Sequence, residues 1–368
     1  MSLVTVKYDI LVSGIYPTKG KFEKNGFKLI TNIVDNEKIN SIFAMGVLYL
    51  SPYLGFCCYN NENENPIYLT LNKEISFDID YGETEEYNRE FTTEYLQSKN
   101  LFDEINDLEK LMTLEINNYI KFPIKIIKVF NHQGNMISMI GDIEKINVPS
   151  LMSTDIDSIT EIMKRQKNRL GNSFSYESIS ELKKNNMYFA NALDVYFSSF
   201  SVSDEKVGFV LLVTALESLL NLSTYSKPKK CSQCSQPVYA IADTVSQNVG
   251  LILMNQDESF IKEIRSLYGK RSKYIHNGKQ DITKKDEQNM QEYVRKVLLM
   301  YWVISMTNKT FKHKEIIKYM QSSEYQNNLS CKTFLTALNN VSYNEIETEV
   351  LKQIFHKILK GTLYLGNS

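Results

Sequence analysis

The segment VGFVLLVTALESLLN, residues 207–221, is apolar on almost every side when it is drawn as a helix. A helix without a polar face is covered by neighbours all round, so this segment predicts the central helix of a bundle. Its only charged residue between Val207 and Leu220 is Glu217. A carboxylate in a buried position needs a partner, because an unpaired buried charge is strongly unfavourable.

The sequence on both sides of this segment also has a helical pattern. From residue 176 to residue 308, apolar residues recur at spacings of three and four, and proline is nearly absent. Capping residues mark the helix ends: Ser203 before the central helix, Asp257 or Ser259 before a later helix, Asn277-Gly278 at its end, and Thr283 with Asp286 as a capping box. We expect an all-α bundle of about five helices over residues 176–308, and a smaller helical extension over 309–368.

Residues 1–145 have a different character. Short segments rich in β-branched and aromatic residues, such as LVTVKYDILVSGIYP and IKIIKVF, are separated by Gly, Asn, Asp and Pro. Residues 92–120 lie between these segments and have a helical or irregular pattern, and residues 146–175 are typical of a linker. The expected fold class is α+β, with a β-rich N-terminal domain, sandwich-like or barrel-like and carrying a helical insertion, before the all-α bundle.

Composition and charge exclude several classes of protein. Hydrophobic residues make up 43% of the 368-residue chain and charged residues 23%, which is typical of globular domains. No apolar run reaches the roughly 20 residues of a membrane helix, and we expect no signal peptide. Five cysteines, an odd number, do not favour a disulfide framework. We therefore expect a soluble, cytoplasmic protein with no membrane partner.

A charged residue interrupts the apolar stripe of one predicted helix, IRSLYGKRSKYIHNGK at residues 264–279. The stripe consists of Ile264, Leu267, Tyr268 and Ile275. Arg271 falls on the same line, where a guanidinium needs an anion. We expect Glu217 of the central helix to face Arg271 across the bundle. An ion pair with a purely architectural role is the alternative to a functional one.

His276, one of only four histidines in the chain, follows five residues after Arg271. On a regular helix the two side chains lie about 140° apart, so they converge on one ligand only if the last turn loosens, which Asn277-Gly278 would allow. Histidine transfers protons near neutral pH, and arginine grips phosphate through two nitrogens. The pair is a minimal set for acid–base chemistry on a phosphodiester. An ordinary core or surface histidine is the alternative.

Positive charge is concentrated around this motif. Between Lys262 and Lys285 there are eight basic and two acidic residues, a net charge of +6, although the whole chain carries −1. Such a local field attracts phosphates. Lys270 and Lys273 contribute to it, and Ser272 adds a hydroxyl beside Arg271. A solvated basic helix end is the alternative.

The motif and the central helix together resemble a known family. VLLVTALESLLN at residues 210–221, with IRSLYGKRSKYIHNG at residues 264–278, is similar to the HEPN superfamily, in particular to the Apea-like HEPN domains of bacterial defence proteins. The superfamily motif is Arg, four to six residues, then His, which Arg271 and His276 match. The resemblance covers residues 180–308.

The resemblance implies a metal-independent endoribonuclease that acts on RNA as a homodimer, in anti-phage defence or a toxin-like system. Each active site would combine the motifs of both chains, and the N-terminal domain would sense or regulate. A ribose 2′-OH would attack the adjacent phosphate and leave a 2′,3′-cyclic phosphate. The implied catalytic residues are His276 as acid or base, Arg271 on the phosphate, Ser272 orienting it and Glu217 holding Arg271. RNA contacts are expected from Lys270, Lys273, Tyr274 and Lys279. No cofactor is required.

Two other functions remain open. A catalytically inactive HEPN-like module would bind nucleic acid or a partner protein through the same motif without cleaving it. A purely structural protein would use Glu217 and Arg271 only as a core ion pair. RNA cleavage that depends on His276 would distinguish the ribonuclease from both of these alternatives.

A second motif lies in KPKKCSQCSQPVYA, residues 227–240, where Cys231 and Cys234 form a C-x2-C pair. The pair resembles half of a zinc site, which would need two more ligands from Cys331, His313 or a partner chain. A plain surface loop and a redox pair are the alternatives.

Overall fold

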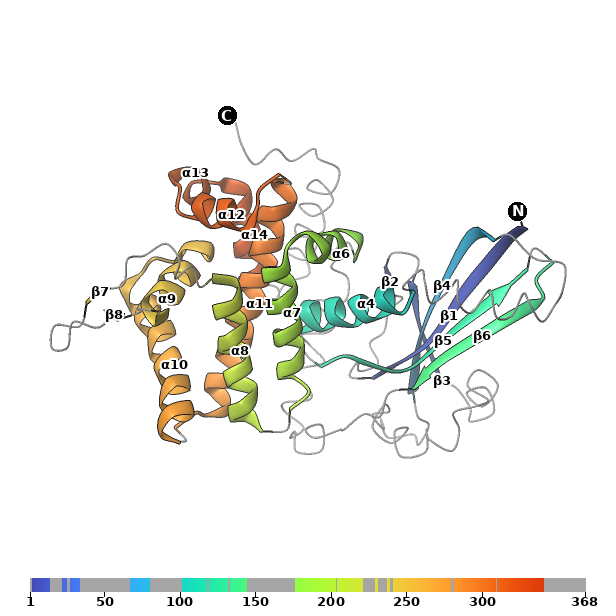
Figure 1. The fold of residues 1–368 in the computed structure, drawn as a ribbon, viewed down its shortest axis with the longest axis horizontal. Helices are drawn as coiled ribbons and strands as arrows, with labels where there is room; N and C mark the ends of the chain where they lie inside the picture. Colours follow the sequence, from blue (N-terminus) through green and yellow to red (C-terminus); the bar gives the residue numbers. More distant parts are fainter. Residues whose placement is uncertain are drawn as a thin grey trace. The chain divides into compact units, whose positions relative to one another are not determined.

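The structure, a computed structural model, describes residues 2–13, 22–24, 27–33, 67–79, 101–117, 119–131, 133–143, 176–202, 204–220, 229–230, 237–238, 241–278, 281–308 and 310–340 (Figure 1). The chain divides into two units, residues 1–171 and 172–368. The division falls within the stretch 146–175 that the sequence suggests as a linker.

The N-terminal unit contains an antiparallel sheet and a helix. The strands are β1 (Ser2–Ser13), β2 (Phe22–Lys24), β3 (Phe27–Ile33), β4 (Ile67–Ile79), β5 (Lys121–Phe130) and β6 (Met136–Ile143), and the helix is α4 (Leu101–Ile116). The strand order is β2-β3-β4-β1-β5-β6. β4 covers most of NPIYLTL, residues 65–71, and ISFDIDY, residues 75–81, whose patterns predict two separate strands, and β6 is a strand that the sequence pattern does not predict. The sandwich-like or barrel-like arrangement stays a prediction.

Helix α4 is joined to strand β5 by polar as well as apolar contacts. The buried carboxylate of Glu109 accepts a hydrogen bond from the backbone N–H of Phe122 at 2.6 Å. Lys125, only 1% exposed, donates from Nζ to the Asn106 side chain at 2.7 Å. Each buried charge therefore has a hydrogen-bond partner, as burial requires.

The second unit is a helical bundle, with one small two-stranded ribbon. The helices are α6 (Tyr176–Asn185), α7 (Met187–Ser199), α8 (Glu205–Leu220), α9 (Ile241–Ile252), α10 (Glu258–Asn277), α11 (Lys284–Thr307), α12 (His313–Met320), α13 (Ser323–Gln326) and α14 (Leu329–Asn340). The ribbon pairs β7 (Lys229–Lys230) with β8 (Pro237–Val238).

Helix α8 is the central helix, as its apolar sequence predicts. It contacts α7, α9, α10 and α11 (Figure 1). Gly208 allows a close approach to α7, because a Cβ at this position would lie 3.2 Å from the carbonyl oxygen of Ser199. Ser203, the expected cap, lies outside the described residues, and Asp204 instead accepts a hydrogen bond from the N–H of Lys206.

The predicted boundaries of α10 and α11 are confirmed. Asp257 is the N-cap of α10, and Gly278 ends it in the left-handed conformation with φ 64°. Thr283 and Asp286 form the expected capping box at the start of α11. The apolar stripe of α10 is shorter than expected, because Ile275 is 46% exposed while Ile264 and Leu267 are buried.

The helical pattern of residues 178–200 is divided into α6 and α7 at Asn186. This residue has an extended backbone, and its side chain accepts a hydrogen bond from the N–H of Phe189, which caps α7. The C-terminal helices α12–α14 pack on the same bundle. Tyr325 donates a hydrogen bond to the carbonyl oxygen of Ile252 at the end of α9.

Within the described part of the chain, no helix is both long and apolar enough to span a membrane.

Candidate functional site

The expected partner of Arg271 is Glu217, and the structure brings the two together. Arg271 lies on α10 and Glu217 on α8, and Nη2 of the arginine is 3.3 Å from Oε2 of the glutamate. Both side chains are mostly buried, with 21% and 18% of their surfaces exposed. The pair thus has its charge neutralised within the bundle, while about a fifth of the arginine side chain is exposed to solvent.

A third residue, Tyr268, completes this cluster. Its hydroxyl donates a hydrogen bond to Oε1 of Glu217, so each oxygen of the carboxylate has a partner. The guanidinium of Arg271 also lies 5.8 Å from the centre of the Tyr268 ring. Burial, together with the hydrogen bond to Glu217, raises the pKa of Tyr268, so its hydroxyl keeps its proton and acts as a donor.

The sequence pattern did not single out Tyr268. It lies on the apolar stripe of α10, where tyrosine is an ordinary core residue. The available signal is its spacing, because a residue three positions before Arg271 lies on the same helix face. A tyrosine at that position reaches the same partner as the arginine.

The guanidinium of Arg271 is not fully satisfied by this cluster. Its Nε is buried and has no hydrogen-bond partner among the described residues. A buried donor without a partner is unfavourable by about 1–3 kcal/mol. The arginine therefore keeps donor capacity beyond its bond to Glu217.

His276 occupies a different environment from Arg271. It is an exposed residue in the last turn of α10, where the C-terminal end of the helix dipole favours a cation. Helix α10 continues through Asn277, so the last turn does not loosen and the separation of about 140° from Arg271 holds. In the ranges that the structure describes, His276 has no hydrogen bond or ion pair. One chain alone does not bring the two motif residues to a common point.

Among the other predicted site residues, Lys270 already has an anionic partner within the chain. Lys270 forms an ion pair with the capping-box carboxylate of Asp286, at 2.7 Å. Burial raises the pKa of Asp286, but hydrogen bonds from Lys270 and Thr283 outweigh this effect and the pKa is lowered. Asp286 is therefore ionised at neutral pH, and it neutralises a lysine that was expected to attract RNA.

The remaining residues lie next to Arg271 or beyond the end of α10. Ser272 and Tyr274 are half-buried and Lys273 is exposed. Lys279 lies outside the described residues, as do Cys231 and Cys234. The strands on either side of the two cysteines pair Lys229 with Val238 and Lys230 with Pro237. Across the described ranges, no group of three or more potential metal ligands was found.

The chain matches no protein-family model, and no curated protein and no solved structure is significantly similar to it.

Proposed function

We propose that the helical unit is a metal-independent endoribonuclease of the HEPN type. The observation that carries the proposal is the position of Arg271, which lies five residues before His276 and is held by Glu217 of the central helix. An arginine with a partly exposed side chain, fixed by a mostly buried carboxylate, is preorganised to bind a phosphate. The HEPN-like bundle fold is part of this proposal.

The reaction needs a base, an acid and a cation. The base removes the proton from a ribose 2′-OH, whose oxygen attacks the adjacent phosphorus. The bond from phosphorus to the 5′-oxygen breaks, and the acid protonates the leaving oxygen. His276 serves as base or acid, Arg271 stabilises the charge on the phosphate oxygens, Ser272 orients the phosphate and Glu217 holds Arg271. No metal takes part in these steps.

The same proposal includes a homodimer. Arg271 and His276 lie about 140° apart on one continuous helix, so the motif of a second chain is required to complete each site. Ile275, the residue before His276, is 46% exposed, and an apolar side chain in that position is suited to a chain–chain contact. Val207, near the start of α8, is a second exposed apolar residue. The start of α8 and the end of α10 lie at the same end of the unit (Figure 1).

The role of the protein in the cell is proposed from the resemblance alone. A ribonuclease of this type would act in the cytoplasm of a bacterium, in anti-phage defence or as a toxin, and Lys273, Tyr274 and Lys279 would contact RNA beside the site. The β-rich N-terminal unit would sense the trigger or restrain the nuclease. A sandwich-like or barrel-like arrangement of that unit belongs to the same proposal.

An RNA-binding module without catalytic activity is the second candidate. The observation that favours it is the exposure of His276, which has no hydrogen-bond partner to orient its ring among the described residues. Catalytic histidines are usually oriented by a second group. In the ribonuclease proposal the partner chain supplies that group.

Cleavage of RNA by the purified full-length chain separates the two candidates. We expect wild-type protein to cut single-stranded RNA and to leave DNA of the same sequence intact, because DNA lacks the 2′-OH. The His276→Ala variant should retain RNA binding and lose cleavage by at least about 100-fold. The matched control is Arg265→Ala, which removes an arginine from the same helix that is paired with Asp243 on α9. Binding without cleavage by the wild type would favour the inactive module.

A further inference from the structure

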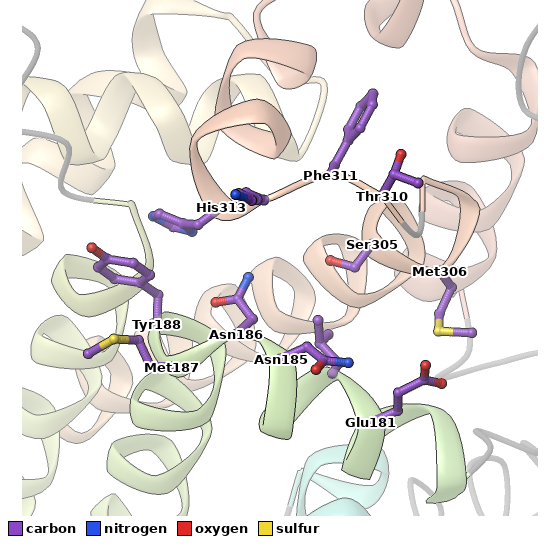
Figure 2. A pocket seen from close by; sticks show the side chains of 12 residues that line it. Glu181, Asn185, Asn186, Met187, Tyr188, Ser305, Met306, Thr310, Phe311 and His313 are labelled. Atoms are coloured by element: carbon purple, nitrogen blue, oxygen red, sulfur yellow. The ribbon is translucent and has the colours of Figure 1, made fainter.

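A pocket of about 430 Å³ lies in the helical unit and shares no residue with the Arg271 cluster. It opens between the junction of α6 with α7 and the junction of α11 with α12 (Figure 2). Its volume is in the range of small-molecule sites. Figure 2 shows the side chains of Tyr188, Asn186 and His313 together on one side of it.

Two buried side chains, Asn186 and Tyr301, and the half-buried His313 form a hydrogen-bonded chain that ends at the pocket. The Asn186 side chain uses its oxygen to accept from the N–H of Phe189, at 3.1 Å. Its nitrogen therefore faces Tyr301 and donates to the tyrosine hydroxyl, at 2.7 Å. The hydroxyl proton has no acceptor among the described residues other than Nδ1 of His313, at 2.7 Å, so we assign the proton to this bond, because a buried hydroxyl proton without an acceptor is unfavourable. The helix cap at Phe189 thus sets the orientation of the Asn186 amide, and the need of the buried Tyr301 proton for an acceptor sets the direction of the last bond.

This chain determines which nitrogen of His313 carries the proton. Burial lowers the pKa of His313 to about 4, so the imidazole is neutral at pH 7. Because Nδ1 accepts the proton of Tyr301, the single ring proton is on Nε2. Tyr188 stacks on the imidazole with ring centres 4.0 Å apart and holds its plane. Nε2–H is a fixed donor with no hydrogen-bond partner among the described residues.

The rest of the lining is apolar or balanced in charge. Met187, Met306 and Leu182 supply thioether and aliphatic surface, which packs well on flat rings. Met187 and Tyr188 are 66% and 45% exposed, so apolar surface at the pocket is open to solvent.

Polar groups complete the lining. Glu181 and Lys312 carry opposite charges, which leaves no net charge to attract an anion. Asn185 and Thr310 add an amide and a hydroxyl that suit the hydroxyl groups of a sugar.

We propose that this pocket binds an uncharged heteroaromatic molecule of the nucleoside class, with a ring carbonyl or ring nitrogen that accepts a hydrogen bond from Nε2 of His313. The heterocycle lies against the thioether of Met187 and the ring of Tyr188. The proposal does not depend on the proposed ribonuclease function, because none of these residues belongs to the Arg271 cluster.

The test is calorimetric titration of the full-length chain with adenosine, guanosine, cytidine and uridine, and with the four matching monophosphates. We expect saturable binding of at least one nucleoside, with no tighter binding of its monophosphate. His313→Phe keeps a flat apolar ring but removes the donor, and it should weaken binding about tenfold, as the loss of one hydrogen bond does. Met187→Ala, at an exposed position that tolerates truncation, should also weaken binding through lost ring contact.

Two variants serve as controls. His276→Ala should bind the nucleoside as the wild type does, even if it abolishes RNA cleavage. Lys318→Ala, on the exposed side of α12, should also leave binding unchanged. The proposal is overturned if no nucleoside binds saturably, if both pocket variants bind as tightly as the wild type, or if the monophosphate binds tenfold more tightly, which would indicate an anion site.

Discussion

Glu217 on α8 holds two residues of α10 at once: its Oε2 lies 3.3 Å from Nη2 of Arg271, and its Oε1 accepts the hydroxyl proton of Tyr268. The central helix thereby fixes the position of the one arginine in the family-like motif. In the proposed ribonuclease this carboxylate contributes to stability and to catalysis, and the two contributions can be measured separately.

A double-mutant cycle on Glu217→Gln and Arg271→Met measures the stability contribution. Each single change leaves a mostly buried group without its partner, and we expect a loss of about 1–3 kcal/mol in the free energy of unfolding. The double variant should lose less than the sum, with a coupling energy of about 0.5–3 kcal/mol. Chemical denaturation monitored by circular dichroism provides all four values. Strict additivity would show that the two side chains do not interact in solution.

Tyr268→Phe removes one hydroxyl and keeps the ring. Because the hydroxyl donates to Glu217, its loss frees one carboxylate oxygen and loosens the group that holds Arg271. We expect RNA cleavage to fall several-fold through kcat with little change in KM, since in the proposed site Tyr268 acts only through Glu217. Steady-state kinetics on a fluorogenic RNA makes this comparison. A change confined to KM would instead place Tyr268 in substrate binding.

Glu287→Gln should raise stability above pH 4.5, and the gain should be nearly complete once the pH passes 7. Burial, reinforced by the charge of Glu205, raises the pKa of Glu287 from 4.5 to about 7. The unfolded chain releases this proton at lower pH than the folded chain does, so the stability associated with Glu287 is present below pH 4.5 and is lost as the pH rises through 7. Allowing for partial solvent screening, the variant should be more stable than the wild type by about 1–2 kcal/mol at pH 8. Urea denaturation should show no such gain at pH 4.5. An equal gain at both pH values would show that the raised pKa of Glu287 is not its cause.

Ile275→Glu tests the proposed homodimer. The change places a charge on an exposed apolar side chain beside His276, and a charge in a chain–chain contact is unfavourable. We expect the variant to sediment as a monomer in analytical ultracentrifugation and to lose cleavage. Lys262→Glu is the control, because it changes the charge at an exposed position on the same helix. An Ile275→Glu variant that stays dimeric and active would show that the dimer interface does not include Ile275.

Mixing two inactive variants tests whether the site is shared. If Arg271 of one chain acts with His276 of the other, an equal mixture of Arg271→Ala and His276→Ala chains forms some dimers with one intact site. After denaturation and joint refolding, we expect about a quarter of the wild-type activity. Activity that stays at the level of the single variants would show that each site needs more than one arginine and one histidine.

Sequence reasoning succeeded where the decisive interactions are local or where a residue stands out. Thr283 and Gly278 cap their helices within one helical turn, and Asp257 marks the start of α10 without a side-chain capping bond, so neighbours in the sequence suffice to predict these boundaries. Glu217 and Arg271 were paired correctly because each is a lone charge on an apolar surface.

Sequence reasoning failed where the partner is distant. Asn186 divides the helical pattern because its side chain caps α7 and bonds to Tyr301, which lies 115 residues further along the chain. No local pattern reports such a partner. The ion pair between Lys270 and Asp286, at the start of α11, likewise joins residues of two different helices, and the role of Lys270 in RNA binding stays a prediction. Ile275 follows the apolar period and is nevertheless exposed.

Analysis of the RNA ends produced by the wild type tests the central claim most directly. The proposed attack by the 2′-OH predicts a 2′,3′-cyclic phosphate on one fragment and a 5′-hydroxyl on the other, from a chain treated with a metal chelator. It also predicts that a single 2′-deoxy nucleotide at the cleaved position blocks the cut, and that His276→Ala and Arg271→Ala yield no such ends. Fragments with 3′-hydroxyl and 5′-phosphate ends, or unchanged cleavage by either variant, would contradict the account.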